Sequence, residues 1–316
     1  AFSGCKSLKQ VAFENPSSCV KFDKGLFNEC SSLEFIEIPS SLTIIKNDVF
    51  KKCIKLNHIE IPSKIQRIEN SLFSDCSSLT EINIHHLISI ISPGSFQNCA
   101  NLTEIKFEEN SILKEIGNNA FSGCFKLKQI QIPSSVDYIY DCAFKNCASL
   151  VEILIPESVK SLGFAVFNGC LNLKKVTLPN SISQILEKSF KGCKQLSDIV
   201  IPDSVELIGR KAFCRCFALE KIRIPSSVKK IDEAAFEFCT GITEIELPSS
   251  INEIEKSTFC GCVSLNKIEI PSSVKVIKGD AFCRCIELEN VLIPSSVTSI
   301  DPTAFDGCIK LKTKIP

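Results

Sequence analysis

Residues 212–231 read Ala-Phe-Cys-Arg-Cys-Phe-Ala-Leu-Glu-Lys-Ile-Arg-Ile-Pro-Ser-Ser-Val-Lys-Lys-Ile, and this pattern recurs from one end of the 316-residue chain to the other. Its most regular feature is a Phe three residues before a Cys, here Phe213 and Cys216. The pair occurs fourteen times at a spacing of 23 residues, with only two steps of 25. A fixed period of this length predicts a stacked array, in which each repeat buries its apolar edge against its neighbours.

One repeat contains two extended segments joined by turns. Leu219, Ile222 and Ile224 have the strand spacing L-x-x-L-x-L, whose alternation points both Ile side chains inward and Arg223 outward. Pro225 ends this strand, because proline lacks the N–H that a sheet ladder needs. A second extended segment over 228–231 leads into the Ala-Phe-x-x-Cys turn, which is too short for an α-helix and predicts a 3-10-like turn. We therefore expect strands to dominate and helix to be scarce.

The full pattern L-x-x-I-x-I-P-x-S-V-x-x-I-x-x-x-A-F-x-x-C resembles the BspA-type (Treponema pallidum-type) leucine-rich repeat over essentially the whole chain. Departures are local: His85 and Glu108 stand where the Pro is expected, and two residues are inserted in the first and fifth repeats. The resemblance implies an α/β leucine-rich-repeat solenoid that is mostly β. Such a fold is a curved right-handed stack with a parallel concave sheet and short 3-10 turns on the convex side.

Composition excludes several classes of partner. Lys plus Arg equals Asp plus Glu at 36 each, so the chain lacks the excess basic charge that nucleic acid or an anionic membrane would require. No stretch approaches the roughly 18 apolar residues of a membrane span. The chain begins and ends inside a repeat, so we expect residues 1–316 to form a single array of about fourteen repeats, cut from a longer chain.

The nineteen cysteines divide into a regular column and a few exceptions. Fourteen follow the Phe by three residues and are expected to be buried, where Cys behaves as a small apolar residue. Cys19 is expected in the core as well. Cys214, Cys260 and Cys283 form C-x-C pairs and are expected nearer the solvent. Cys260 and Cys283 belong to consecutive repeats and form the candidate disulfide, whereas C-x-C spacing supports a zinc site only weakly.

No catalytic set is evident. The three histidines are His58, His85 and His86, and they are interpreted as polar positions of irregular repeats rather than as metal ligands or an acid–base pair. The chain has no Gly-rich phosphate loop, G-x-S-x-G or H-E-x-x-H motif. We predict that it is not an enzyme and that it needs no cofactor and no metal.

Recognition is expected on the concave sheet, because only outward positions are free to vary. Leu154 and Val200 are apolar there without a structural need, and basic residues flank them, as at protein interfaces. The alternative interpretation is ordinary surface variation, since isolated exposed apolar residues are common. The candidate binding residues are Val151, Leu154, Lys175, Thr177, Val200, Lys221 and Arg223.

Three functions are compatible with such an array. The resemblance favours a cell-surface or secreted module for adhesion, because similar proteins are surface-exposed adhesion or protein-binding molecules of host-associated bacteria and protozoan parasites. Its partner would be a host or extracellular-matrix protein, or a second copy of the chain. An intracellular protein-interaction scaffold, with a cytoplasmic location, is the first alternative. A non-catalytic arm of a larger enzyme is the second.

Overall fold

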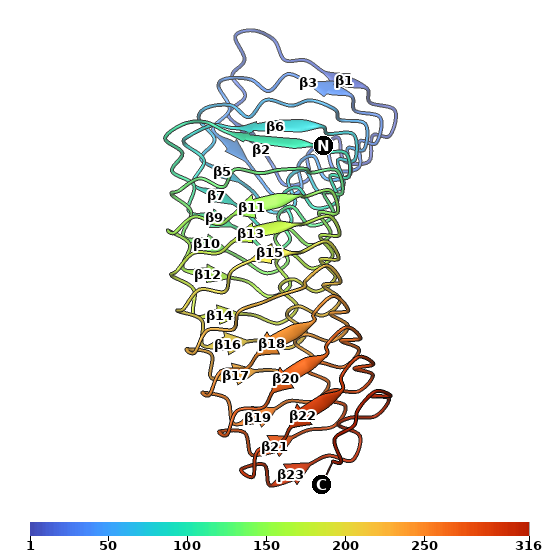
Figure 1. Ribbon diagram of the computed structural model, residues 1–316. Coiled ribbons are helices and arrows are strands. Elements are labelled where there is room, and N and C mark those ends of the chain that lie inside the picture. Colours follow the sequence, from blue (N-terminus) through green and yellow to red (C-terminus); the bar gives the residue numbers. More distant parts are fainter. Residues whose placement is uncertain (316) are drawn as a thin grey trace. The chain divides into compact units, whose positions relative to one another are not determined.

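Most 23-residue repeats form one turn of a parallel β-solenoid, with two short strands and a series of tight turns (Figure 1). The computed structural model describes residues 1–315 and divides into two units, Ala1–Val166 and Phe167–Pro316. We call the strands formed by the L-x-x-I-x-I segments the first-strand series, and those that follow the Pro-Ser turn the second-strand series. The solenoid fold predicted from the repeat is confirmed.

In the unit 1–166 the second-strand series is the more continuous. Its strands β5, β7, β9, β10 and β12 form one parallel five-stranded sheet, whereas the pairs of the first-strand series inside this unit are β1–β3 and β6–β8. The first-strand series here is β1 (Gln10–Val11), β3 (Phe35–Ile36), β6 (Glu81–Ile84), β8 (Glu104–Phe107) and β11 (Glu152–Leu154). The second-strand series is β2 (Lys21–Phe22), β4 (Ile44–Ile45), β5 (Arg67–Ile68), β7 (Ile90–Ile91), β9 (Glu115–Ile116), β10 (Tyr138–Ile139) and β12 (Ser161–Leu162).

In the unit 167–316 each series forms short parallel sheets. The first-strand series pairs as β13–β15 and β18–β20–β22, and the second as β14–β16–β17 and β19–β21–β23. The first-strand series is β13 (Lys175–Thr177), β15 (Asp198–Ile199), β18 (Glu244–Glu246), β20 (Lys267–Glu269) and β22 (Asn290–Leu292). The second-strand series is β14 (Gln184–Ile185), β16 (Leu207–Ile208), β17 (Lys230–Ile231), β19 (Glu253–Ile254), β21 (Val276–Ile277) and β23 (Ser299–Ile300).

The strands keep the side-chain alternation expected from the sequence. In β6, Ile82 and Ile84 are buried while Glu81 and Asn83 are exposed. The register follows the repeat, so that Ile82 lies opposite Ile105 in β8. Equivalent residues of successive repeats therefore stack in columns. A position that recurs in the sequence forms a continuous row of side chains on one face of the sheet.

The Ala-Phe-x-x-Cys segment is not a 3-10 helix, so that part of the prediction was wrong. In twelve of the fourteen repeats, the residues two before and two after the Phe have positive φ, as Lys211 (φ 55) and Arg215 (φ 64) do around Phe213. A 3-10 helix needs negative φ at every residue. The segment instead consists of consecutive turns, closed by bonds such as Cys216 N–H to Phe213 C=O (3.0 Å). Every second N–H donates to the next repeat, as from Phe213 to Ala235 C=O (2.8 Å).

The core consists of stacked columns of Phe and Cys. The Phe213 and Phe236 rings are stacked with centroids 5.3 Å apart, and both side chains are fully buried. Beside them, Cys239 Sγ donates to the carbonyl oxygen of Phe213 over 3.0 Å. The thiol is thus a small apolar group that also satisfies a buried backbone acceptor, which explains why Cys suits this position.

Candidate binding surface

The outward positions of the first-strand series carry the predicted residues of the unit 167–316. Val200 directly follows β15 and is 70% exposed. The register pairs Lys175 with Asp198 and Val176 with Ile199, so Thr177 lies beside Val200 on the outward side. The Val200 side chain does not contribute to the core, because the neighbouring Ile199 already fills the inward position.

The basic residues beside Val200 are engaged in ion pairs with neighbouring side chains. Lys175 lies 3.3 Å from Asp198, and Lys221 lies 3.2 Å from Glu244. Arg223 Nη1 donates to Asp203 Oδ1 over 2.9 Å. These side chains are all more than half exposed, so each pair contributes about 0–1 kcal/mol. The basic residues that were predicted to flank the exposed apolar side chains are therefore paired with acidic side chains and are not free cations.

Val151 and Leu154 belong to the unit 1–166. Leu154 is the last residue of β11 and is 60% exposed, while Val151 directly precedes that strand and is 42% exposed. Ile153 between them is buried. The seven predicted residues thus fall into two groups, and each group lies on the first-strand series of its own unit.

Two exposed apolar features were missed by the sequence interpretation. Leu292 ends β22, opposite Glu269, and is 78% exposed. On the second-strand series, Tyr138 and Tyr140 stack with ring centroids 6.1 Å apart, and Lys160 Nζ lies 5.6 Å above the Tyr138 ring. The signal for the second feature was available, because these two tyrosines are the only ones in the chain.

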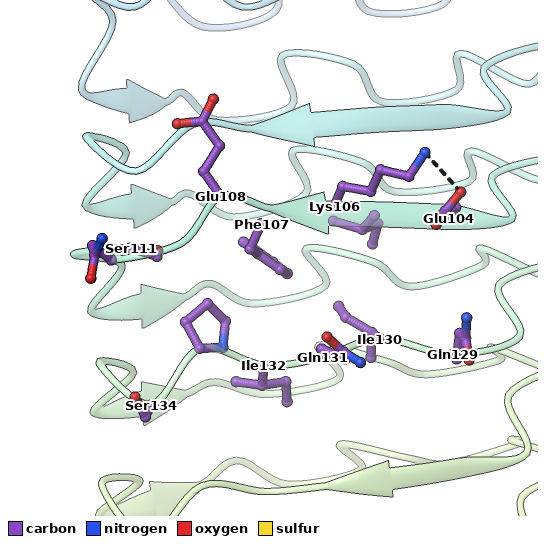
Figure 2. Close-up of a pocket in the computed structure, with 13 residues that line it drawn as sticks. Glu104, Lys106, Phe107, Glu108, Ser111, Gln129, Ile130, Gln131, Ile132 and Ser134 are labelled. Carbon is purple, nitrogen blue, oxygen red and sulfur yellow. Dashed lines mark ion pairs between the residues drawn. The ribbon is translucent and has the colours of Figure 1, made fainter.

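A groove of about 520 Å³ opens in the unit 1–166 between β8 and the segment 129–134 (Figure 2). Ile105 and Phe107 line one side, and Ile130 and Ile132 line the other. The feature of the sequence that marks this groove is the insertion of two residues in the fifth repeat, between Phe107 and Leu113.

The three histidines do not form a common site. His58 lies 3.8 Å from Glu60, whereas His86 Nδ1 lies 2.8 Å from Glu108 Oε2 and lowers the pKa of that carboxyl through the hydrogen bond. Burial lowers the pKa of His85, whose side chain is 7% exposed. Across residues 1–315, no group of three His, Cys, Asp or Glu side chains is placed to hold a metal ion.

Twelve of the fourteen column cysteines are buried as predicted, whereas Cys5 is exposed and Cys308 is half-buried. The four cysteines outside the column that the sequence singled out behave differently from one another. Cys214 is buried rather than near solvent, because its Sγ donates to Glu237 Oε2 (3.4 Å) in the next repeat. Cys19 is only half-buried rather than in the core. Cys260 and Cys283 are both half-buried, and their thiols are hydrogen-bonded to each other. Their pairing as a disulfide stays a prediction.

Comparison with known proteins agrees with the repeat geometry. The family model described as the BspA type leucine rich repeat region (6 copies) matches residues 1–124, 114–242 and 206–315. The chain belongs to this family. BspA-type repeats form a protein-interaction fold, and no helix in the described part of the chain could cross a membrane. No curated protein matches the chain.

Two solved structures share 30% sequence identity with this BspA-type chain. A leucine-rich repeat protein from Bacteroides ovatus has a TM-score of 0.89, with 99% of this chain and 79% of that chain covered. A leucine rich cell surface protein from Faecalibacterium prausnitzii has a TM-score of 0.50, with 84% and 86% covered. A leucine-rich repeat protein from Eubacterium ventriosum (20% identity, TM-score 0.56, 94% and 80% covered) shares the fold.

Proposed function

We propose that this chain is a non-enzymatic protein-binding module that acts at a cell surface in adhesion or in the capture of a host protein. The observation that supports the proposal most is the exposure of Leu154 and Val200 on the first-strand series. Inward positions of the same strands are uniformly apolar and buried, so packing does not require apolar residues outside. The F. prausnitzii relative, described as a cell surface protein, supports the location.

The cysteine content does not favour a cytoplasmic scaffold over this proposal. The column thiols are buried, and their carbonyl partners hold them inside the array, as Cys99 is held by Phe73. Burial raises the pKa of Cys99 well above its ordinary value, so little reactive thiolate forms near neutral pH. Such thiols remain reduced in an oxidising compartment as well.

The test measures binding of the chain to immobilised laminin, to immobilised collagen and to itself by surface plasmon resonance. We expect saturable binding to at least one of these proteins. Leu154→Asp and Val200→Asp each place a charge on the proposed surface, and at least one should weaken binding tenfold or more. Matched controls on the second-strand series, Ser161→Asp and Gln184→Asp, should bind like the unmodified chain. Binding that tolerates both first-strand variants would overturn the assignment of this surface.

A further inference from the structure

Strand β8 and the segment 129–132 face each other without a backbone hydrogen bond. On one side β8 pairs with β6 over four residues, from Glu81↔Glu104 to Ile84↔Phe107. On the other side, within the described part of the chain, no backbone hydrogen bond joins residues 104–107 to residues 129–132. Alternate N–H and C=O groups of a strand point to opposite sides. Half of those in β8 therefore point toward the 129–132 segment and lack a strand partner.

The same two repeats are joined in the usual way at their turn segments and at their second strands. Their turn segments are connected by the bond from Phe96 N–H to Ala120 C=O (2.8 Å). Their second strands pair as well, with Ile116 opposite Ile139. The opening is therefore confined to the first-strand series and is framed by two intact ladders.

The separated strands enclose a usable space. The groove has a volume of about 520 Å³, which lies within the roughly 300–1,000 Å³ of typical ligand sites. Figure 2 shows the labelled side chains of both edges around it, with Lys106 and Phe107 on β8 and Ile130 and Gln131 on the other segment. The apolar residues that line the groove include Ile105, Phe107, Ile130 and Ile132, and polar side chains and the two backbones supply the rest of its surface.

The inserted loop accounts for the opening at one end. The five residues 108–112 separate Phe107 from Leu113, where a regular repeat has three residues. Asn110 has positive φ (58), and Ser111 Oγ accepts a bond from Leu113 N–H (3.3 Å), so the loop has a defined conformation. Glu108 is fixed at the end of the strand by His86 (2.8 Å).

The unpaired edges define what can fill the groove. An occupant must offer hydrogen bonds on both of its sides at once, which a single extended chain does and the edge of a folded sheet does not. Every second side chain of the occupant would lie on the side of Ile105, Phe107, Ile130 and Ile132, which favours apolar residues at these positions. The others would lie beside Gln129, Gln131 and Lys106. Lys106 already pairs with Glu104 (3.2 Å) and Glu81 (3.6 Å), so no particular charge is required.

We propose that this groove binds a linear peptide segment as an additional parallel strand between β8 and residues 129–132. The four residues on each edge set its length at about four residues, or ~13 Å. Strand addition of this kind takes affinity from main-chain hydrogen bonds and specificity from alternate side chains. The inference rests on the protein-binding function proposed above and names an extended peptide as a class of partner.

The probe is the acetylated and amidated peptide Asn-Lys-Ile-Glu-Ile, which copies residues 266–270. This sequence contains β20, which pairs in parallel with β18 on one side and β22 on the other. Isothermal titration calorimetry measures its binding to the intact chain. Two further probes carry N-methyl groups, one on the amides copied from Lys267 and Glu269, the other on those copied from Ile268 and Ile270. Two-sided insertion predicts saturable binding of the parent and at least tenfold weaker binding of both methylated probes.

Hydrogen exchange of the free chain tests the premise directly. Amides of residues 129–132 should exchange much faster than those of β20 and become protected when the probe binds. A variant lacking Glu109 and Asn110 restores the 23-residue spacing and should protect the same amides while losing probe binding at least tenfold. Its β20 amides report whether it is folded.

Three results would overturn the inference. The first is protection of the 129–132 amides in the free chain, and the second is no saturable binding of the parent probe. The third is loss of binding with only one methylated probe, which indicates addition to a single edge. None of these depends on the deletion variant being stable. Retained binding to laminin, collagen or a second copy, together with no probe binding, would remove this inference and leave the proposed function intact.

Discussion

Cys99 Sγ donates a hydrogen bond to the carbonyl oxygen of Phe73, one repeat earlier, over 3.1 Å. The same oxygen accepts the N–H of Cys76 within its own turn (3.1 Å). Buried column cysteines such as Cys99 therefore connect two successive repeats through a backbone group that is also part of a turn. This relationship makes the cysteines structural, and it leads to specific expectations for stability.

Replacing one column thiol should destabilise the array moderately. Cys99→Ala removes the Sγ donor and leaves a small void at a fully buried position, which together cost about 1–2 kcal/mol. Cys5→Ala is the matched control, because Cys5 is exposed, and it should change stability by less than about 0.5 kcal/mol. Urea unfolding followed by circular dichroism measures both. Equal midpoints for the two variants would contradict the structural role.

The stability of the array should fall above pH ~8.5, the ordinary pKa of a cysteine thiol. Burial raises the pKa of Cys53 to about 12 and that of Cys99 well above its ordinary value. The folded chain thus keeps protons that the unfolded chain releases, so the stabilisation is complete below pH ~8.5 and is lost as the pH rises toward 12.

Each such thiol contributes a slope of about 1.4 kcal/mol per pH unit in this window. Thermal unfolding between pH 7 and pH 10 measures the decline. Cys99→Ala should reduce the slope by the contribution of one group. A flat profile over this range would show that the column thiols are not shielded from solvent.

The Phe column should tolerate truncation even less. The Phe236 ring is stacked between Phe213 (5.3 Å) and Phe259 (5.7 Å) and is fully buried. Phe236→Ala should cost about 3–5 kcal/mol. Because both contacts lie between repeats, hydrogen exchange should accelerate in the repeats on either side as well. Phe217→Ala, at a 38% exposed position, is the control and should cost less than about 1 kcal/mol. A purely local exchange effect would argue against coupling through the column.

The buried columns of stacked apolar side chains were predictable from the sequence. Phe213, Cys216 and Ile222 recur at fixed spacing because an inward position accepts only apolar residues, and the structure buries all three. The outward surface was less predictable. Partners such as Glu244 for Lys221 depend on the register between repeats, which sequence alone does not give for long flexible side chains.

The groove beside β8 was missed for a different reason. The insertion of two residues in the fifth repeat was recognised, but an insertion does not reveal whether the adjoining strands separate. The first repeat also carries two extra residues, yet β1 and β3 remain paired there, with Val11 opposite Ile36. An insertion of two residues is therefore not sufficient by itself to separate neighbouring first strands, so the length of a repeat does not predict the groove.

The left-handed turn positions also escaped prediction, although part of their signal was present. The residue two after each Phe has positive φ in all fourteen repeats, and six of these residues are Gly. Non-Gly residues such as Lys52 and Arg284 obscured the pattern. Because Cβ makes this conformation unfavourable for L-residues, the non-Gly positions carry a backbone cost that the surrounding turns impose.

Because a non-Gly residue with positive φ carries this backbone cost, replacing it by glycine should stabilise the protein. Arg284 has φ 60, and its N–H donates to Asp306 C=O (2.7 Å), a bond that any residue can make. Arg284→Gly removes the Cβ strain and should raise the free energy of unfolding by about 0.5–1 kcal/mol. Arg284→Ala is the matched control, because it removes the same long side chain but keeps Cβ, and its stability should stay close to that of the unmodified chain. The midpoints of urea unfolding decide the matter: an alanine variant as stable as the glycine variant would show that the side chain, rather than the left-handed backbone, carries the cost.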